Sequence, residues 1–87
     1  MDIGVEVSLY PLAEDFGPRI KAFLDRLQGS AAAARLKIVT TSLSTQVFGA
    51  YEDVLGTLER EMLTTFGEVG KAVFLLKVFG PLAAPDS

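Results

Sequence analysis

The apolar residues of this chain switch between two spacings, and the order of those switches restricts the fold more than any other feature. Near the start every second residue is apolar, at Ile3, Val5, Val7 and Leu9. Successive side chains of a strand point to opposite faces, so this alternation predicts a half-buried strand. Pro11 cannot donate a ladder hydrogen bond, and the strand is therefore expected to end near Tyr10. Its second face carries Glu6, Ser8 and Tyr10.

Apolar residues then recur at helical spacing over residues 16–27. Asp15 is a suitable N-cap for this helix, since its carboxylate can accept a backbone N–H of the first turn, and Gly29 is expected to end it. Residues 30–35 are rich in alanine and either extend the helix by a turn or cross loosely to the next strand. A second helix is predicted from Tyr51, with acidic residues in its first turn, where the helix dipole favours them.

Three further strands are predicted. Residues 36–40 and 44–48 form a hairpin with a tight turn between them, and Gly49 is expected to break its second arm. The last strand, 71–79, is dense in Val, Phe and Leu, and Lys77 alone interrupts its apolar residues. Because these residues fall on both faces of the strand, both faces are expected to be covered.

The resulting order is strand, helix, strand, strand, helix, strand. Right-handed crossovers turn this order into an α+β, ferredoxin-like βαββαβ sandwich, with a four-stranded antiparallel sheet and two helices on one face. The chain is expected to form one such domain over residues 1–87, with a flexible tail at 82–87. The open face of the sheet would gather side chains from three strands: Glu6, Ser8, Tyr10, Ser44, Gln46, Phe48, Val73, Leu75, Lys77 and Phe79.

Size and composition favour self-association. The chain has 87 residues, of which 49% are hydrophobic, and its mean hydropathy is +0.37. One small core cannot hide that much apolar surface. We therefore expect a homodimer that packs through the open sheet face, with association to a tetramer left open.

Charge and residue content exclude several classes of protein. The formal net charge is −3 without a run of lysine or arginine, so no nucleic-acid partner is expected. The sequence contains neither cysteine nor histidine, which leaves no disulfide, thiolate or histidine chemistry, and no metal or cofactor is expected. It also has no secretory signal pattern, and its longest apolar run is too short to cross a bilayer, so no membrane contact and a cytoplasmic location are expected.

Two segments carry a family resemblance. Residues 5–12 (VEVSLYPL) and 42–49 (SLSTQVFG) resemble the YkoF-type thiamine/hydroxymethylpyrimidine-binding family, in the single-repeat form found in the thiamine-binding protein superfamily. The resemblance implies a ferredoxin-like fold whose open sheet faces pack together in dimers or between tandem repeats. It also implies thiamine, or its hydroxymethylpyrimidine moiety, as ligand. This chain holds one repeat and would need a second copy to match the two-repeat protein.

Such a ligand needs an aromatic surface, hydrogen-bonding groups and a carboxylate near the thiazolium ring. The candidate ligand-binding residues are Glu6, Ser8, Tyr10, Ser44, Thr45, Gln46 and Phe48. Tyr10 and Phe48 would supply the surface, Glu6 the charge, and the others the hydrogen bonds. Thr45 points to the helix side by strict alternation, so its inclusion rests on the family motif.

Each of these residues also has a purely structural interpretation. Glu6 and Lys77 can form a cross-strand ion pair, and Phe48 can bury itself against a second sheet. Residues 59–61 are predicted to form a solvated helix face. Gly67 and Gly70 are expected to close the second helix and not to form a phosphate loop, because no lysine–hydroxyl pair accompanies them.

The leading functional hypothesis is non-catalytic binding of thiamine or hydroxymethylpyrimidine, as a carrier or sensor in thiamine supply. The alternative is an oligomeric structural or regulatory module whose open sheet face serves self-association without a specific ligand. An enzyme is the least expected, because only Glu6 or Tyr10 could act as a base, and no catalytic residue is assigned.

Overall fold

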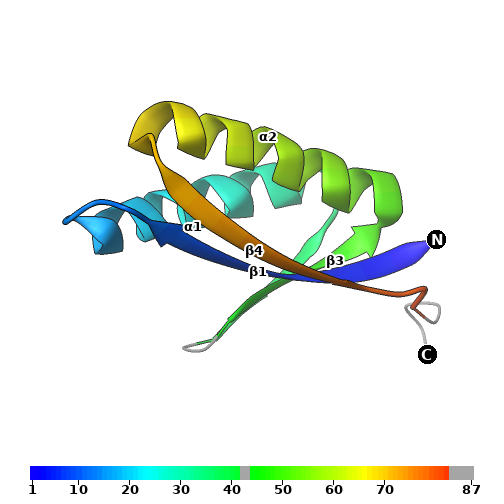
Figure 1. Cartoon of the computed structure of the whole chain (residues 1–87). Helices are drawn as coiled ribbons and strands as arrows, with labels where there is room; N and C mark the ends of the chain where they lie inside the picture. Colours follow the sequence, from blue (N-terminus) through cyan, green and yellow to red (C-terminus); the bar gives the residue numbers. More distant parts are fainter. Residues whose placement is uncertain (42–43, 83–87) are drawn as a thin grey trace.

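The computed structural model describes residues 1–41 and 44–82 and contains the six elements in the expected order (Figure 1). They are β1 (Asp2–Pro11), α1 (Phe16–Ala33), β2 (Lys37–Thr40), β3 (Thr45–Ala50), α2 (Tyr51–Val69) and β4 (Ala72–Phe79). The strands form one antiparallel sheet in the order β2-β3-β1-β4, with both helices on one face. The ferredoxin-like α+β fold is confirmed. The expected turn at 42–43 and residues 83–87 of the expected flexible tail (82–87) lie outside the described residues, whereas the N–H of Leu82 donates to the carbonyl of Asp2 at 2.8 Å.

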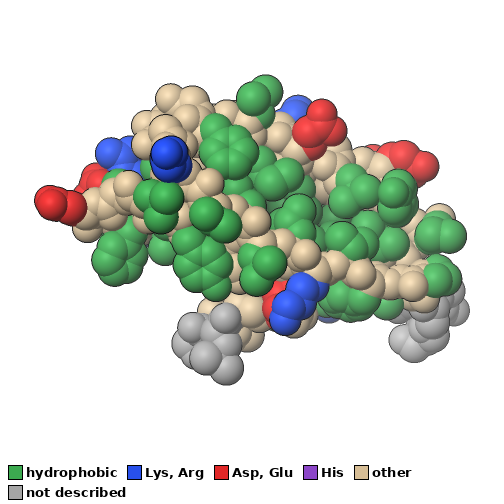
Figure 2. Space-filling model, in the orientation of Figure 1, with side chains coloured by type: hydrophobic (Ala, Val, Ile, Leu, Met, Phe, Trp, Pro, Cys, Tyr) green, Lys and Arg blue, Asp and Glu red, His purple; other side chains and the backbone are tan. Residues whose placement is uncertain are grey.

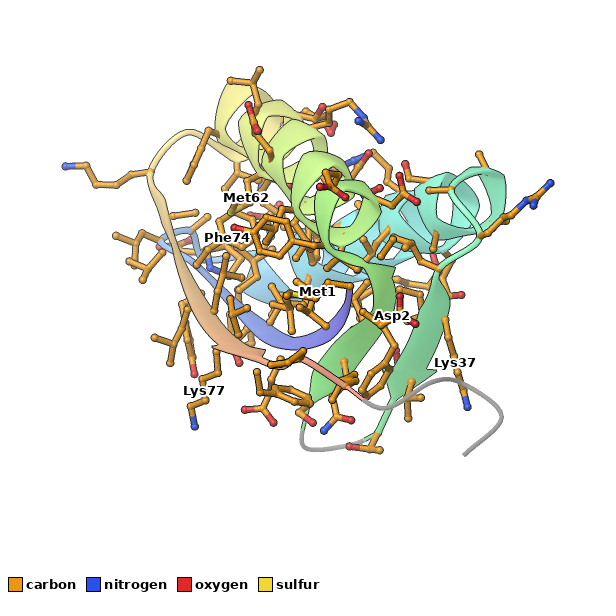
Figure 3. The ribbon with its side chains drawn as sticks, turned by 90° about the vertical axis from the view of Figure 1, so that its right-hand side faces the viewer. Met1, Asp2, Lys37, Met62, Phe74 and Lys77 are labelled. Carbon is orange, nitrogen blue, oxygen red and sulfur yellow. The ribbon has the colours of Figure 1, made fainter. Side chains whose placement is uncertain are left out.

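β1 occupies the centre of the core. Its apolar face is buried beneath the helices, as the alternation predicts, and comprises Ile3, Val5, Val7 and Leu9. Phe23 and Leu27 from α1 and Val54 and Leu58 from α2 pack onto this face. Figure 3 shows the resulting layer of side chains between the helices and the sheet, with Met62 and Phe74 at its rim. The other face of β1 is left to the open side of the sheet.

The first helix takes the longer of its two expected forms, in which residues beyond Gly29 extend it by a turn. It passes through Gly29 and continues to Ala33, so the expectation that Gly29 ends it was wrong. The apolar repeat explains the extension, because Ala31 is buried and continues the stripe of Leu27. The chain leaves the helix when Arg35 adopts a left-handed conformation with φ 60°, and the N–H of Leu36 donates to the carbonyl of Ala31 at 2.9 Å. This is a Schellman ending with arginine where glycine is usual.

The other predicted breaks are partly corrected. Gly49 does not end β3, which continues to Ala50. A side chain on Gly49 would meet the end of the Leu36 side chain, so this glycine lets Leu36 pack closely against β3 and does not break the strand. Gly67 lies inside α2, whereas Gly70, with φ 82°, follows its end as predicted.

Asp15 precedes α1 as expected, but its side chain makes no hydrogen bond to the backbone of the first turn. Its carboxylate instead accepts a hydrogen bond from Nε of Arg19 at 2.9 Å. That hydrogen bond, together with the positive charge of Arg19, lowers the pKa of the exposed Asp15 carboxyl. The contact is therefore present above the ordinary pKa of aspartate and is lost as the pH falls through the lowered value.

The two helices are joined by a polar cluster that corrects the prediction for residues 59–61. Glu61 is only 8% exposed, and its carboxylate accepts hydrogen bonds from Nε of Arg26 at 3.1 Å and from Oγ of Ser30 at 2.8 Å. Arg26 also donates to Oγ1 of Thr65 at 2.7 Å and to the carboxylate of Glu68 at 2.7 Å. Glu61 is thus a buried partner of α1 and not part of a solvated face, whereas Glu59 and Arg60 are exposed as expected.

Exchanging Glu61 for glutamine should lower the free energy of unfolding by about 1–3 kcal/mol, because the charged acceptor of Arg26 and Ser30 is lost inside the interface. Glu59→Gln on the exposed face is the matched control and should change it by less than about 0.5 kcal/mol. Urea unfolding followed by circular dichroism measures both. Equal effects of the two substitutions would contradict the assigned role of Glu61.

Gly4 lies beneath two aromatic rings on the open face. A side chain at this position would lie 2.5 Å from the ring of Phe79 and 2.9 Å from that of Phe48. We expect Gly4→Ala to lower the free energy of unfolding by about 1–3 kcal/mol, because the rings must move apart. Gly29→Ala, in the interior of α1 with open space around an added side chain, should instead raise it by about 0.5–1 kcal/mol. Thermal unfolding tests whether Gly4→Ala lowers the stability of the protein while Gly29→Ala raises it.

Candidate functional site

The open face of the sheet carries most of the side chains assigned to it from the sequence. Glu6 lies opposite Gln46 on β3 and Lys77 on β4, and Tyr10 lies opposite Val73. Residues directly opposite each other share a face, so these side chains point away from the helices. Figure 3 shows Lys37 and Lys77 on the side of the sheet that the helices leave open.

One end of this face is aromatic. Phe48 and Phe79 meet edge to face across Gly4, with ring centroids 6.0 Å apart. Phe79 is 42% exposed and Phe48 is half-buried. The pair covers the backbone of β1 and presents an apolar surface to the outside.

Glu6 lies in the middle of the open face, and its structural interpretation has direct support. A carboxylate oxygen of Glu6 lies 3.7 Å from Nζ of Lys77 on the neighbouring strand. At this distance the two groups form an ion pair without a hydrogen bond, and such a pair on a surface contributes little to stability. The two charges offset each other in the centre of the face.

A cleft opens where β1 and β3 separate. β1 pairs with β3 only as far as Val7 opposite Thr45, whereas its ladder with β4 continues to Pro11. On the N-terminal side of Thr45 the hairpin of β2 and β3 diverges from β1. Figure 1 shows β1 and this hairpin running in different directions. The space between them, about 290 Å³, is closed on the helix side by α1. Its lining residues are Val7, Ser8, Leu9, Tyr10, Ile20, Phe23, Leu24, Thr40, Thr41, Ser44 and Thr45.

The cleft brings together four of the seven candidate residues, namely Ser8, Tyr10, Ser44 and Thr45. The other three, Glu6, Gln46 and Phe48, lie outside its lining, further along the open face. Thr45 points to the helix side, as strict alternation requires, and is buried. It still reaches the cleft, because this part of β3 lies at the point where the strands separate.

Residues from two other elements complete the cleft and were not assigned to it from the sequence. Ile20, Phe23 and Leu24 of α1 form its apolar wall. Thr40 and Thr41 contribute from the end of β2, and Oγ1 of Thr41 accepts a hydrogen bond from the backbone N–H of Ser44 at 3.1 Å. Helical periodicity indicates that these α1 residues belong to the core. That they also line the cleft depends on how far β3 departs from β1, which periodicity does not predict.

All described side chains that line the cleft are uncharged. Six of them carry a hydroxyl group, and the rest are apolar or aromatic. Hydroxyl groups both donate and accept hydrogen bonds, and an apolar wall favours a flat ring, so the cleft suits a small neutral heteroaromatic molecule. Across residues 1–41 and 44–82, no group of His, Cys, Asp or Glu side chains is arranged to hold a metal ion. Within the same residues, neither helix has the length and apolar character needed to span a membrane.

No protein-family model and no curated protein matches the chain. Solved structures do match it. A hypothetical protein of Methanocaldococcus jannascii is similar with a TM-score of 0.75 and 20% identity, over 99% of this chain and 87% of its own. A candidate thiamine biosynthesis or salvage protein of Thermotoga maritima is similar with a TM-score of 0.72 and 17% identity, over 93% of this chain and 85% of its own.

A third similar structure is a domain of unknown function from Bacillus cereus, with a TM-score of 0.69 and 11% identity. It is matched over 93% of this chain and 77% of its own length. At such identities the likeness shows a shared fold. The ferredoxin-like arrangement of this chain is therefore one that several bacterial and archaeal proteins of similar length adopt.

Proposed function

We propose that this protein binds thiamine or its hydroxymethylpyrimidine moiety in the cleft between β1 and β3, without catalysing a reaction. The observation that carries the proposal is the uncharged, hydroxyl-rich lining of the cleft beside an aromatic side chain at its rim, Tyr10. Tyr10 is 54% exposed, so its ring is accessible to a ligand. Ser8, Ser44 and Thr45 supply donors and acceptors for the amino group and the ring nitrogens of a pyrimidine.

The pyrimidine is the part of thiamine that the cleft fits best. Thiamine carries a positive charge on its thiazolium ring, and the described residues that line the cleft include no carboxylate. Glu6, the carboxylate expected to meet this charge, points to the open face and lies 3.7 Å from Lys77. Free hydroxymethylpyrimidine should therefore bind more tightly than thiamine, since its recognition requires no counter-charge.

The comparison with known structures supports a role in thiamine metabolism. The similar protein from Thermotoga maritima is named for thiamine biosynthesis or salvage. The segments VEVSLYPL and SLSTQVFG, which resemble the thiamine-binding superfamily, contribute Ser8, Tyr10, Ser44 and Thr45 to the cleft. The described lining of the cleft offers no carboxylate, lysine or arginine for acid–base catalysis. This supports a role as a cytoplasmic carrier or sensor of the pyrimidine precursor.

Self-association through the open face is part of this proposal. Val73, Leu75 and Phe79 are between 42% and 51% exposed and belong to one side of the sheet. A second copy of the chain that packs its own open face against them would cover this apolar surface and the aromatic pair of Phe48 and Phe79.

The second candidate function is an assembly module that binds no specific ligand. It is favoured by the same aromatic pair, which lies at the end of the sheet remote from the cleft and presents apolar surface independently of it. In that case the open face would serve only to join copies of the chain.

Isothermal titration with hydroxymethylpyrimidine, and separately with thiamine, tests the proposal. We expect saturable binding of hydroxymethylpyrimidine, with weaker binding of thiamine. Tyr10→Ala should weaken the binding by about tenfold or more, equivalent to about 1.4 kcal/mol. Tyr51→Ala is the matched control, because Tyr51 is similarly exposed but lies at the start of α2, outside the cleft.

Each outcome of the titration has a defined meaning. Equal losses from both tyrosine variants would remove the cleft as the site. Tighter binding of thiamine than of hydroxymethylpyrimidine would overturn the argument from charge. An absence of heat with either compound, in protein that still associates, would favour the assembly module.

A further inference from the structure

β4 has the composition of a central strand although it lies at the edge of the sheet. Its sequence is AVFLLKVF, and its apolar residues point to both faces. Strands with apolar residues on both faces are typical of positions that are covered on each side and paired along each edge. Within the part of the chain that the structure describes, β4 is paired along one edge only, with β1.

The helix side of β4 is incompletely covered. Val78 lies opposite the buried Val5 and so points to the helices, yet it is 53% exposed. Phe66 of α2, whose ring packs edge to face on Phe74 at 5.4 Å, is 44% exposed. Figure 2 shows hydrophobic side chains along β4 on both sides of the strand. An apolar strip therefore accompanies the unpaired edge on the helix side as well as on the open side.

The opposite edge of the sheet differs. β2 has four residues, of which Lys37 and Thr40 are polar and exposed, whereas β4 has eight residues. Short length and charged side chains are the usual protection of an edge strand against pairing with another chain. β4 has neither proline nor a bulge in its ladder with β1, and Lys77 is its one charged side chain.

We infer that β4 pairs antiparallel with β4 of a second copy of the chain, which joins two four-stranded sheets into one of eight strands. An antiparallel pair about a two-fold axis places open face beside open face and helix side beside helix side. Each β4 would then pair with a strand that is apolar on both faces, as it is itself. Its present neighbour, β1, is apolar on the helix side only. Glu6 of the same chain already lies beside Lys77, so no unpaired charge enters the new contact.

This contact is separate from both proposals above. It uses the backbone edge of β4 and the helix-side residue Val78, whereas packing of the open faces uses the outward side chains of Leu75 and Phe79. The cleft lies on the other side of β1, between β1 and β3, and is not part of the edge. Ligand binding and edge pairing can therefore succeed or fail independently.

Analytical ultracentrifugation and amide hydrogen exchange of the full chain test the inference. The wild-type protein should sediment as a dimer or larger species, with slow exchange of the β4 amides that becomes faster on dilution. Val78→Lys places a charge on the helix side of the edge and should halve the mass and abolish the concentration dependence of β4 exchange. Leu63→Lys places the same charge on an exposed apolar residue of α2, outside the sheet, and is the matched control that should leave β4 protected.

Two results would overturn the inference. One is a wild-type protein of single-chain mass at high concentration. The other is a Val78→Lys variant with the mass and the β4 protection of the wild type. Circular dichroism verifies that the variants are folded. The comparison of Val78→Lys with the wild type distinguishes edge pairing from packing of the open faces, which would also give a mass above that of one chain.

Discussion

The pairing of β1 with two neighbours over unequal lengths determines the rest of this structure. Its ladder with β3 ends at Val7, and its ladder with β4 continues to Pro11. A shift of one residue would turn Ile3, Val5 and the rest of the apolar set to the open side, so the hydrophobic core holds the register. Because the register is held, the point of separation from β3 is also held, and the cleft appears there.

The sequence predicts what depends on periodicity and does not predict what depends on the distance between elements. Alternation alone assigns Ser8, Tyr10 and Thr45 to their correct faces of the sheet. It cannot indicate that the pairing of β3 with β1 begins only at Thr45. This late start leaves Glu6 outside the cleft that holds the hydroxyl groups with which it was grouped. The helix ends show the same limit, because burial of Ala31 outweighs the preference of Gly29 for a terminus.

Glu61 illustrates a signal that is present but ambiguous in the sequence alone. Together with Thr57 and Thr65 it continues the inward stripe of α2 at spacings of four residues. An acidic residue in such a stripe is expected to be buried only if a cation faces it. The cation here, Arg26, belongs to the other helix, so the sequence of α2 alone does not reveal it. The distribution of charge is accordingly uneven: the helix interface holds a partly buried ion pair, the open face a weak one, and the described lining of the cleft none.

The cluster around Arg26 also fixes the position of α1 relative to α2. α1 supplies the wall of the cleft through Ile20, Phe23 and Leu24, and further along the same helix it is fastened to α2 through Arg26 and Ser30. The helix that walls the cleft is thus held in part by residues of α2 that lie outside the cleft lining. Substitutions at this helix interface are therefore expected to move the α1 wall of the cleft while every side chain in the cleft stays the same.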